Sequence, residues 1–135
     1  MREDGGDGVV GIVVVSHSAE LARGVAELAG QAAGPEVRIE PAGGGPDGTL
    51  GTDDGLVRDA IRRANQGDGV VVLGDLGSAI LTIRHVLERS GNGHARLVDA
   101  PLVEGAVTAA VVASAGSDLT QVVQAAEEAR GASKL

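Results

Sequence analysis

The chain has 135 residues, the length of one domain, and can bury a core without disulfides or metals. Its apolar fraction of 43% and charged fraction of 22% exclude a wholly disordered chain, and the lack of cysteine excludes disulfides, thiolate catalysis and Cys-ligated zinc. A net charge of -8 argues against nucleic-acid binding because it repels the phosphate backbone, and the absence of Phe, Tyr and Trp removes the side chains on which bases stack.

We expect a single domain over residues 9–130, between a disordered acidic leader at 1–8 and a flexible tail at 131–135. No apolar run approaches the roughly 18 residues that a membrane span needs. The start of the chain lacks the basic and then apolar layout of a signal peptide. These features predict a cytoplasmic protein without a membrane partner.

Apolar patterning predicts alternating strands and helices. Runs rich in β-branched residues predict four strands, at residues 9–15, 37–40, 70–73 and 95–98. Helical spacing predicts helices over residues 19–33, 56–64, 79–90 and 102–115, and a fifth that begins after residue 118. Ser18 and Ser78 are expected N-caps, Asp118 with Gln121 forms a capping box, and 91–93 closes the third helix.

The helical pattern also predicts which side chains are buried. Apolar residues three and four apart define one face of each helix. The fourth helix is apolar nearly all round, and we expect it to be largely buried. The predicted buried positions of four helices are Leu21, Val25 and Leu28; Leu56, Val57, Ala60, Ile61 and Ala64; Ile80, Ile83 and Leu87; and Leu119, Val122, Val123 and Ala126.

The alternation of strands and helices predicts an α/β fold, an open parallel sheet with helices on both faces and right-handed crossovers. In such sheets ligands bind beyond the carboxyl ends of the strands, where the strand order reverses. The loops after the first, second and third strands are therefore the places where we expect chemistry.

His17 follows the first strand and precedes the first helix. The backbone N–H groups and the dipole at a helix N-terminus favour negative charge, so a phosphoryl group on this imidazole would be stabilised there. A neutral imidazole is also a nucleophile. We therefore predict that His17 is a phosphoryl-accepting nucleophile, although a capping or solvated side chain would give the same pattern.

Asp75 occupies the equivalent position after the third strand. If the first and third strands are neighbours, its carboxylate can accept a hydrogen bond from one ring nitrogen of His17 and leave the other free to attack. A cap or Asx-turn is the alternative role. We expect Asp75 to be exposed and to contribute little to folding.

Glycine-rich segments follow the second and third strands. Their backbone N–H groups, with neighbouring hydroxyls, are candidates to hold a phosphate, although a flexible surface loop has the same composition. Neither segment has the spacing of a nucleotide-binding P-loop or dinucleotide fingerprint. The residues that we expect to contact a phosphoryl group are Ser18, Gly43, Gly44, Thr52, Gly77 and Ser78, with Gly45 and Gly51 as further candidates.

The remaining candidates are weaker. Asp47, Asp53 and Asp54 lie in the long loop but match no fixed metal-ligand spacing, so we expect no metal site. His85 and His94 are expected to be solvated. No nucleophile elbow of the G-x-S-x-G type is present, which disfavours a hydrolase.

Four segments together resemble one known family. VVVSHSAELARGVAEL, PAGGGPDGTLGTDDGLVRDAI, DGVVVLGDLGSAILT and LVDAPLVEGAVTAAVVA, read in order, are similar to the phosphotransferase subunits of phosphoenolpyruvate-dependent dihydroxyacetone kinases. Those subunits belong with the mannose-type EIIA domains of the bacterial phosphotransferase system. The resemblance covers roughly residues 9–130. It implies a four-stranded sheet of order 2-1-3-4 in a homodimer, with Asp75 orienting His17.

The resemblance also implies a reaction. His17 would accept a phosphoryl group from the histidine-containing phosphocarrier protein HPr and pass it to ADP on the nucleotide-binding kinase subunit. The resulting ATP would phosphorylate dihydroxyacetone on a substrate-binding subunit. This chain would bind no cofactor, since ADP, ATP and magnesium belong to the kinase subunit. Some family members carry fused phosphocarrier and enzyme I-like domains; this chain ends after the first domain, so we expect a separate donor.

Two other functions stay open. The same strand, His and Asp arrangement occurs in the EIIA domains of mannose-type sugar transporters, although GTDDG, DLGSA and DAPLVEGA are more typical of the dihydroxyacetone branch. A non-enzymatic ligand-binding α/β module is the third possibility. Phosphorylation of His17 separates both carriers from the binding module.

Overall fold

The computed structural model describes residues 9–90 and 94–135, so the predicted leader at 1–8 and the helix stop at 91–93 lie outside the described residues. Four strands form one parallel sheet of order β2-β1-β3-β4. The strands are β1 (Gly11–Ser16), β2 (Ile39–Gly43), β3 (Val70–Gly74) and β4 (Ala95–Leu97). This arrangement confirms the predicted fold class and strand order.

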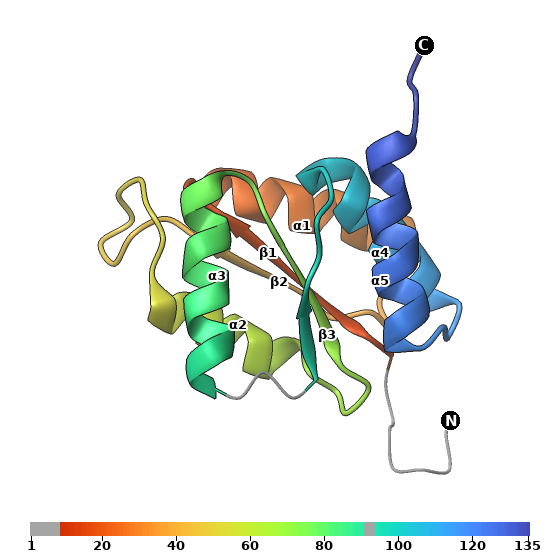
Figure 1. Ribbon diagram of the computed structural model, residues 1–135, viewed down its shortest axis with the longest axis horizontal. Coiled ribbons are helices and arrows are strands. Elements are labelled where there is room, and N and C mark those ends of the chain that lie inside the picture. Colours follow the sequence, from red (N-terminus) through yellow and green to blue (C-terminus); the bar gives the residue numbers. More distant parts are fainter. Residues whose placement is uncertain (1–8, 91–93) are drawn as a thin grey trace.

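Helices cover both faces of the sheet (Figure 1). They are α1 (Ala19–Ala33), α2 (Asp54–Ala64), α3 (Gly77–Ser90), α4 (Leu102–Ser114) and α5 (Leu119–Glu128), followed by the short 3-10 helix η1 (Ala129–Gly131). Alternate residues of β1 point to opposite faces, so that Ile12 and Val14 pack with α1, α4 and α5 and Val13 and Val15 pack with α2 and α3. The two central strands, β1 and β3, are buried on both faces, as the interior of a parallel sheet requires.

The observed bounds of the second strand differ from the predicted bounds of 37–40. β2 begins at Ile39 and continues to Gly43, because residues 39–43 pair with β1 in register. Pro41 lies within this strand opposite Val14. A proline is tolerated here because β2 is an edge strand, on which a missing N–H need not break the sheet.

In the first helix, α1, the predicted burial of two leucines is wrong. Leu21 and Leu28 are 43% and 48% exposed, whereas Ala22, Val25 and Ala29 are buried. The small alanines let α1 pack close to α4, whose buried face is itself made of alanine and glycine. The leucines therefore lie on the flank of the contact.

Other helix predictions need smaller corrections. α2 begins at Asp54 with Asp53 as its N-cap, and Leu56 is 39% exposed. In α4, Val103 and Val111 are 41% and 44% exposed while the other residues are buried or half-buried, which confirms a largely buried helix. The capping box of Asp118 and Gln121 at the start of α5 is confirmed.

The C-terminal end is described to the last residue. Residues 132–135 are exposed and have no regular structure, and the Lys134 ammonium forms an ion pair with Glu104 of α4. Among the described residues, no helix combines the length and the apolar character needed to cross a membrane.

Candidate functional site

The site forms where β1 and β3 end side by side. These strands pair in parallel up to Val15 and Gly74. The residues that follow in the two strands, Ser16–His17 and Asp75, therefore meet at one edge of the sheet. The Asp75 N–H donates to the Val15 carbonyl at 3.2 Å, which extends the pairing by one bond. The predicted adjacency of His17 and Asp75 is therefore confirmed.

The carboxylate of Asp75 fixes the imidazole of His17. One carboxylate oxygen, Oδ1, lies 3.0 Å from Nδ1 of the ring, and the other, Oδ2, accepts from the His17 backbone N–H at 3.1 Å. A carboxylate can only accept, so Nδ1 carries the hydrogen and Nε2 keeps its lone pair. The His17 side chain is 23% exposed, which leaves Nε2 able to react.

Ser16 is a site residue that the sequence reasoning missed. Its side chain is fully buried, and its hydroxyl donates to Asp75 Oδ2 at 2.8 Å while accepting from the Ser18 N–H at 3.0 Å. The signal was a hydroxyl at the end of an otherwise apolar buried strand. Ser16 holds the carboxylate in the orientation that His17 needs.

These contacts also set the charge of Asp75. Burial by itself raises the pKa of this carboxyl, but hydrogen bonds from the Ser16 hydroxyl, the His17 ring and backbone, and the Leu76 N–H outweigh it and hold the pKa below the ordinary 3.8. The side chain is 13% exposed, so the expectation of an exposed carboxylate is wrong, whereas its small contribution to folding stays a prediction. Asp75 is an ionised, partly buried hydrogen-bond acceptor.

The other ring nitrogen of His17 faces the start of α3. Nε2 contacts the hydroxyl of Ser78, which is the second residue of α3 and not its N-cap, so the capping prediction is wrong. Leu76 precedes the helix and has no side-chain acceptor. The first N–H groups of any helix lack intrahelical acceptors. Nε2 is therefore placed beside Ser78 at a helix end that favours anions.

The glycine-rich loop folds against this junction. The Gly44 N–H donates to the Ser16 carbonyl at 3.2 Å and the Gly51 N–H to the His17 carbonyl at 3.0 Å, while the Gly45 N–H bonds Thr49 within the loop at 2.6 Å. A Cβ on Gly43 would lie 2.6 Å from the carbonyl oxygen of Ser18, so only glycine lets α1 approach β2 this closely. The loop therefore packs against the site and is held there by backbone hydrogen bonds.

Hydroxyl groups link the loop to α3. Thr52 Oγ1 lies 2.7 Å from Thr82 Oγ1, and Thr82 also donates to the Ser78 carbonyl at 3.1 Å. Thr82 was not among the residues singled out from the sequence. The pair connects the end of the loop with the helix turn that carries Ser78, the residue that faces His17.

Ser18 has a structural role. Its hydroxyl accepts from the Leu21 N–H at 3.2 Å, which confirms the predicted N-cap of α1. Contact of Ser18, Gly43, Gly44, Thr52, Gly77 and Ser78 with a phosphoryl group stays a prediction.

The remaining titratable candidates lie apart from this cluster. Asp53 caps α2 by accepting from the Gly55 N–H at 2.8 Å, and Asp54 lies 2.6 Å from Nδ1 of His85, so His85 is exposed but paired. His94 and Asp47 are exposed. Within residues 9–90 and 94–135, no three His, Asp or Glu side chains gather as metal ligands would.

Comparison with known proteins places this geometry in a family. A family model, EIIA-man, described as PTS system fructose IIA component, matches residues 11–123. The phosphoryl donor subunit DhaM of the PEP-dependent dihydroxyacetone kinase of Pantoea ananatis is 42% identical over 130 residues, which cover 92% of this chain but 28% of that protein. The DhaM subunit of dihydroxyacetone kinase 2 of Listeria innocua is 38% identical over 106 residues, covering 76% of this chain and 85% of that one.

Solved structures agree with the fold. The crystal structure of EF1359, a protein of unknown function, has a TM-score of 0.83 and 35% identity, and the match covers 94% of this chain and 98% of that chain. The dihydroxyacetone kinase of C. freundii contains the same fold with a TM-score of 0.63 at 16% identity, over 96% of this chain and 26% of that chain. The chain therefore belongs to the EIIA-man family, and its relatives there include DhaM subunits, described as phosphoryl donors of dihydroxyacetone kinases.

Proposed function

We propose that this chain carries a phosphoryl group on Nε2 of His17. The lone pair of Nε2 attacks the phosphorus of a phosphohistidine on the donor protein HPr, the donor's P–N bond breaks, and its imidazole leaves as the new P–N bond forms. In the second step the terminal phosphate oxygen of ADP attacks the same phosphorus. ATP forms on the nucleotide-binding kinase subunit, and the His17 imidazole regains its lone pair.

The observation that carries this proposal is the bond between Nδ1 of His17 and Oδ1 of Asp75, with Nε2 directed toward Ser78. The carboxylate keeps the hydrogen on Nδ1 and supports the positive charge that the ring gains when Nε2 bonds to phosphorus. Phosphoryl transfer needs mainly alignment and charge stabilisation, which this arrangement can supply.

Neighbouring groups would stabilise the transferred phosphoryl oxygens. The Ser78 hydroxyl already occupies the space beside Nε2, and the N–H groups of Gly77 and Ser78 lie at the start of α3. Ser18, Gly43, Gly44 and Thr52 are the further residues that we propose around the phosphoryl group. No cofactor on this chain is required, because the nucleotide and its magnesium would stay on the kinase subunit.

The known roles of the relatives support the direction of transfer. The Pantoea and Listeria proteins are described as phosphoryl donor subunits of PEP-dependent dihydroxyacetone kinases. This chain spans 28% of the Pantoea protein and 85% of the Listeria protein. HPr as donor, the kinase subunits as acceptors and a homodimeric state are parts of the proposal.

The test is phosphorylation with defined components. The full chain is incubated with phosphoenolpyruvate, enzyme I and HPr, and we expect one acid-labile, base-stable phosphate that is absent from His17→Ala. His85→Ala and His94→Ala are the matched controls and should label normally. An unlabelled parent chain, or equal labelling of His17→Ala, contradicts the proposal.

The second step distinguishes the two carriers. Addition of the ADP-loaded nucleotide-binding subunit should discharge the phosphorylated chain and form ATP. Persistence of the label with the kinase subunit, together with its loss to the membrane component of a mannose-type transporter, would identify the sugar carrier instead.

A further inference from the structure

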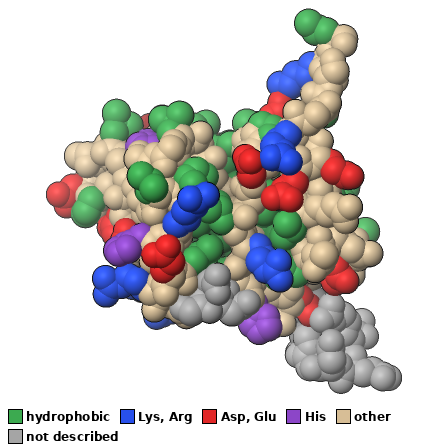
Figure 2. All heavy atoms as spheres, in the orientation of Figure 1, with side chains coloured by type: hydrophobic (Ala, Val, Ile, Leu, Met, Phe, Trp, Pro, Cys, Tyr) green, Lys and Arg blue, Asp and Glu red, His purple; other side chains and the backbone are tan. Residues whose placement is uncertain are grey.

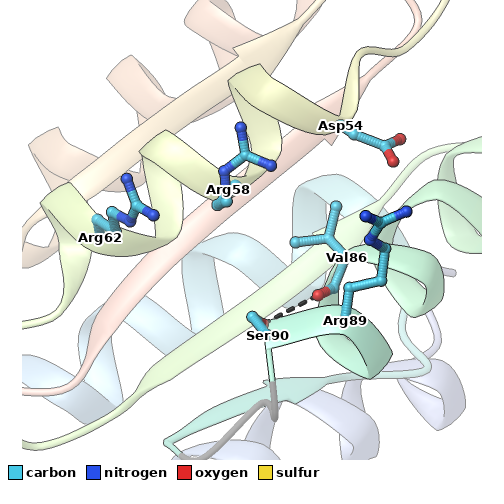
Figure 3. A pocket seen from close by; sticks show the side chains of 6 residues that line it. All are labelled: Asp54, Arg58, Arg62, Val86, Arg89 and Ser90. Carbon is cyan, nitrogen blue, oxygen red and sulfur yellow. Dashed lines mark hydrogen bonds between the residues drawn. The ribbon is translucent and has the colours of Figure 1, made fainter.

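A cleft between α2 and α3 carries unpaired positive charge. It encloses about 520 Å³ and opens on the surface (Figure 3). Buried Val86 lies among its lining residues. The six lining residues are Asp54, Arg58, Arg62, Val86, Arg89 and Ser90.

The arginines of this cleft are available to a ligand. In the described part of the chain, neither Arg58 nor Arg89 forms an ion pair, and Arg62 reaches only its helix neighbour Asp59 at 3.8 Å. The single carboxylate of the cleft, Asp54, is already bound by His85 at 2.6 Å. The cleft is therefore positive in a protein whose formal net charge is -8.

The guanidinium groups are spread out and do not converge on one point. Figure 3 shows Arg58 and Arg62 one turn apart along α2, with Arg89 on α3 pointing toward Asp54. In Figure 2, Lys and Arg side chains are scattered over this face of the molecule, with Asp and Glu side chains between them. A row of separated cations fits an extended acidic segment better than a single small anion.

One helix, α3, both lines the cleft and contacts the reactive histidine. Ser78 at the start of α3 contacts Nε2 of His17, and Arg89 lies three turns further along, which is about 16 Å by the rise of an α-helix. Leu76 and Leu81, at the start of α3, are 61% and 67% exposed. A protein docked on His17 therefore needs to extend only along α3 to reach both leucines and Arg89.

We propose that the cleft docks an acidic segment of the protein that exchanges a phosphoryl group with His17, with Leu76 and Leu81 as the apolar contacts nearer the histidine. This inference rests on the proposed function. The arginines speed association and set the orientation of the partner, and they take no part in the transfer itself.

The test compares two triple variants with equal formal charge. The cleft variant is Arg58→Gln, Arg62→Gln and Arg89→Gln, and the control is Arg38→Gln, Arg96→Gln and Arg130→Gln, whose side chains do not line the cleft. Second-order rate constants are measured for phosphorylation by phosphorylated HPr and for discharge to the ADP-loaded kinase subunit, each at low and high salt.

We expect the cleft variant to lose about tenfold at low salt in at least one exchange, with a flatter salt dependence, and the control to lose less than twofold. Circular dichroism and the thermal midpoint establish that both variants are folded. Equal rates for the two variants in both exchanges overturn docking at the cleft.

A binding titration with an octaglutamate peptide separates this proposal from the carrier function. The parent and the control variant should bind the peptide more tightly than the cleft variant does, and equal binding by all three overturns the docking site. Labelling of His17 is scored independently, so a parent chain that binds the peptide but is never phosphorylated contradicts the carrier function alone.

Discussion

Two strand-to-helix junctions lie side by side in this molecule and are built differently. Where β1 leads into α1, Ser18 caps the helix by accepting from the Leu21 N–H. Where β3 leads into α3, the preceding residue is Leu76, which has no acceptor, and the nearest carboxylate, Asp75, bonds Ser16, His17 and the Leu76 N–H. At the first helix end a backbone N–H is bonded by the side chain of the cap residue Ser18. The second helix end has no such side-chain cap and lies beside Nε2 of His17.

This difference indicates that, at one edge of the sheet, one junction mainly stabilises the fold and the other mainly supplies groups for the reaction. The capped junction holds the backbone that carries His17. The other junction supplies the orienting carboxylate and a helix end that favours anions. Changes at the two junctions should therefore separate into effects on rate and effects on stability.

Asp75→Asn should give the largest effect at the second junction. An amide can donate toward Nδ1, so the hydrogen and the ring orientation of His17 are no longer specified. We expect phosphorylation of His17 to slow by about 100-fold, the order of loss that follows from a misaligned reacting group. Initial rates of labelling by phosphorylated HPr provide the measurement, and an unchanged rate would contradict the orienting role.

Ser16→Ala tests the link between the two junctions. The substitution leaves Asp75 Oδ2 and the Ser18 N–H without their shared partner in a buried place. We expect a loss of about 1–3 kcal/mol in the free energy of unfolding, the usual cost of an unsatisfied buried group. Phosphorylation should slow by less than in Asp75→Asn. Urea denaturation and labelling rates measure both, and Ser16→Thr should recover part of the loss if the hydroxyl is what matters.

Ser18→Ala and Ser78→Ala form a matched pair across the junctions. Loss of the α1 cap should lower the free energy of unfolding by about 1 kcal/mol. Loss of the Ser78 hydroxyl should leave stability nearly unchanged, because it removes a contact at an exposed helix start, and should slow transfer by several-fold. Thermal denaturation and labelling rates of the two variants provide the measurements. A loss of stability in Ser78→Ala and not in Ser18→Ala would mean that Ser78 has the structural role.

The pH dependence of stability should show the smallest effect. The pKa of Asp75 is lowered in the folded protein, so its ionised form stabilises the fold above the unfolded value of 3.8 and this contribution is lost as the pH falls through the folded pKa. The difference in unfolding free energy between the parent and Asp75→Asn should be constant above pH 3.8 and shrink below it. A difference that grows on acidification would contradict the sign of the shift.

Much of this protein is determined locally by its sequence. The runs of β-branched residues specify β1 and β3, the cap residues Ser18 and Asp118 specify where α1 and α5 begin, and the strand ends place His17 and Asp75 directly after β1 and β3. These features depend on residues within one turn or one strand of each other, so periodicity and capping chemistry reveal them.

Other features are decided only by the tertiary structure. β2 includes Pro41 because pairing with β1 at an open edge outweighs local preference. Leu21 and Leu28 are exposed because alanines on α1 and α4 permit close packing. Ser16 and the arginine cleft depend on residues that are distant in sequence, such as Asp75 for Ser16. Contacts of this kind arise from how the sheet and helices pack, and a local pattern does not carry that information.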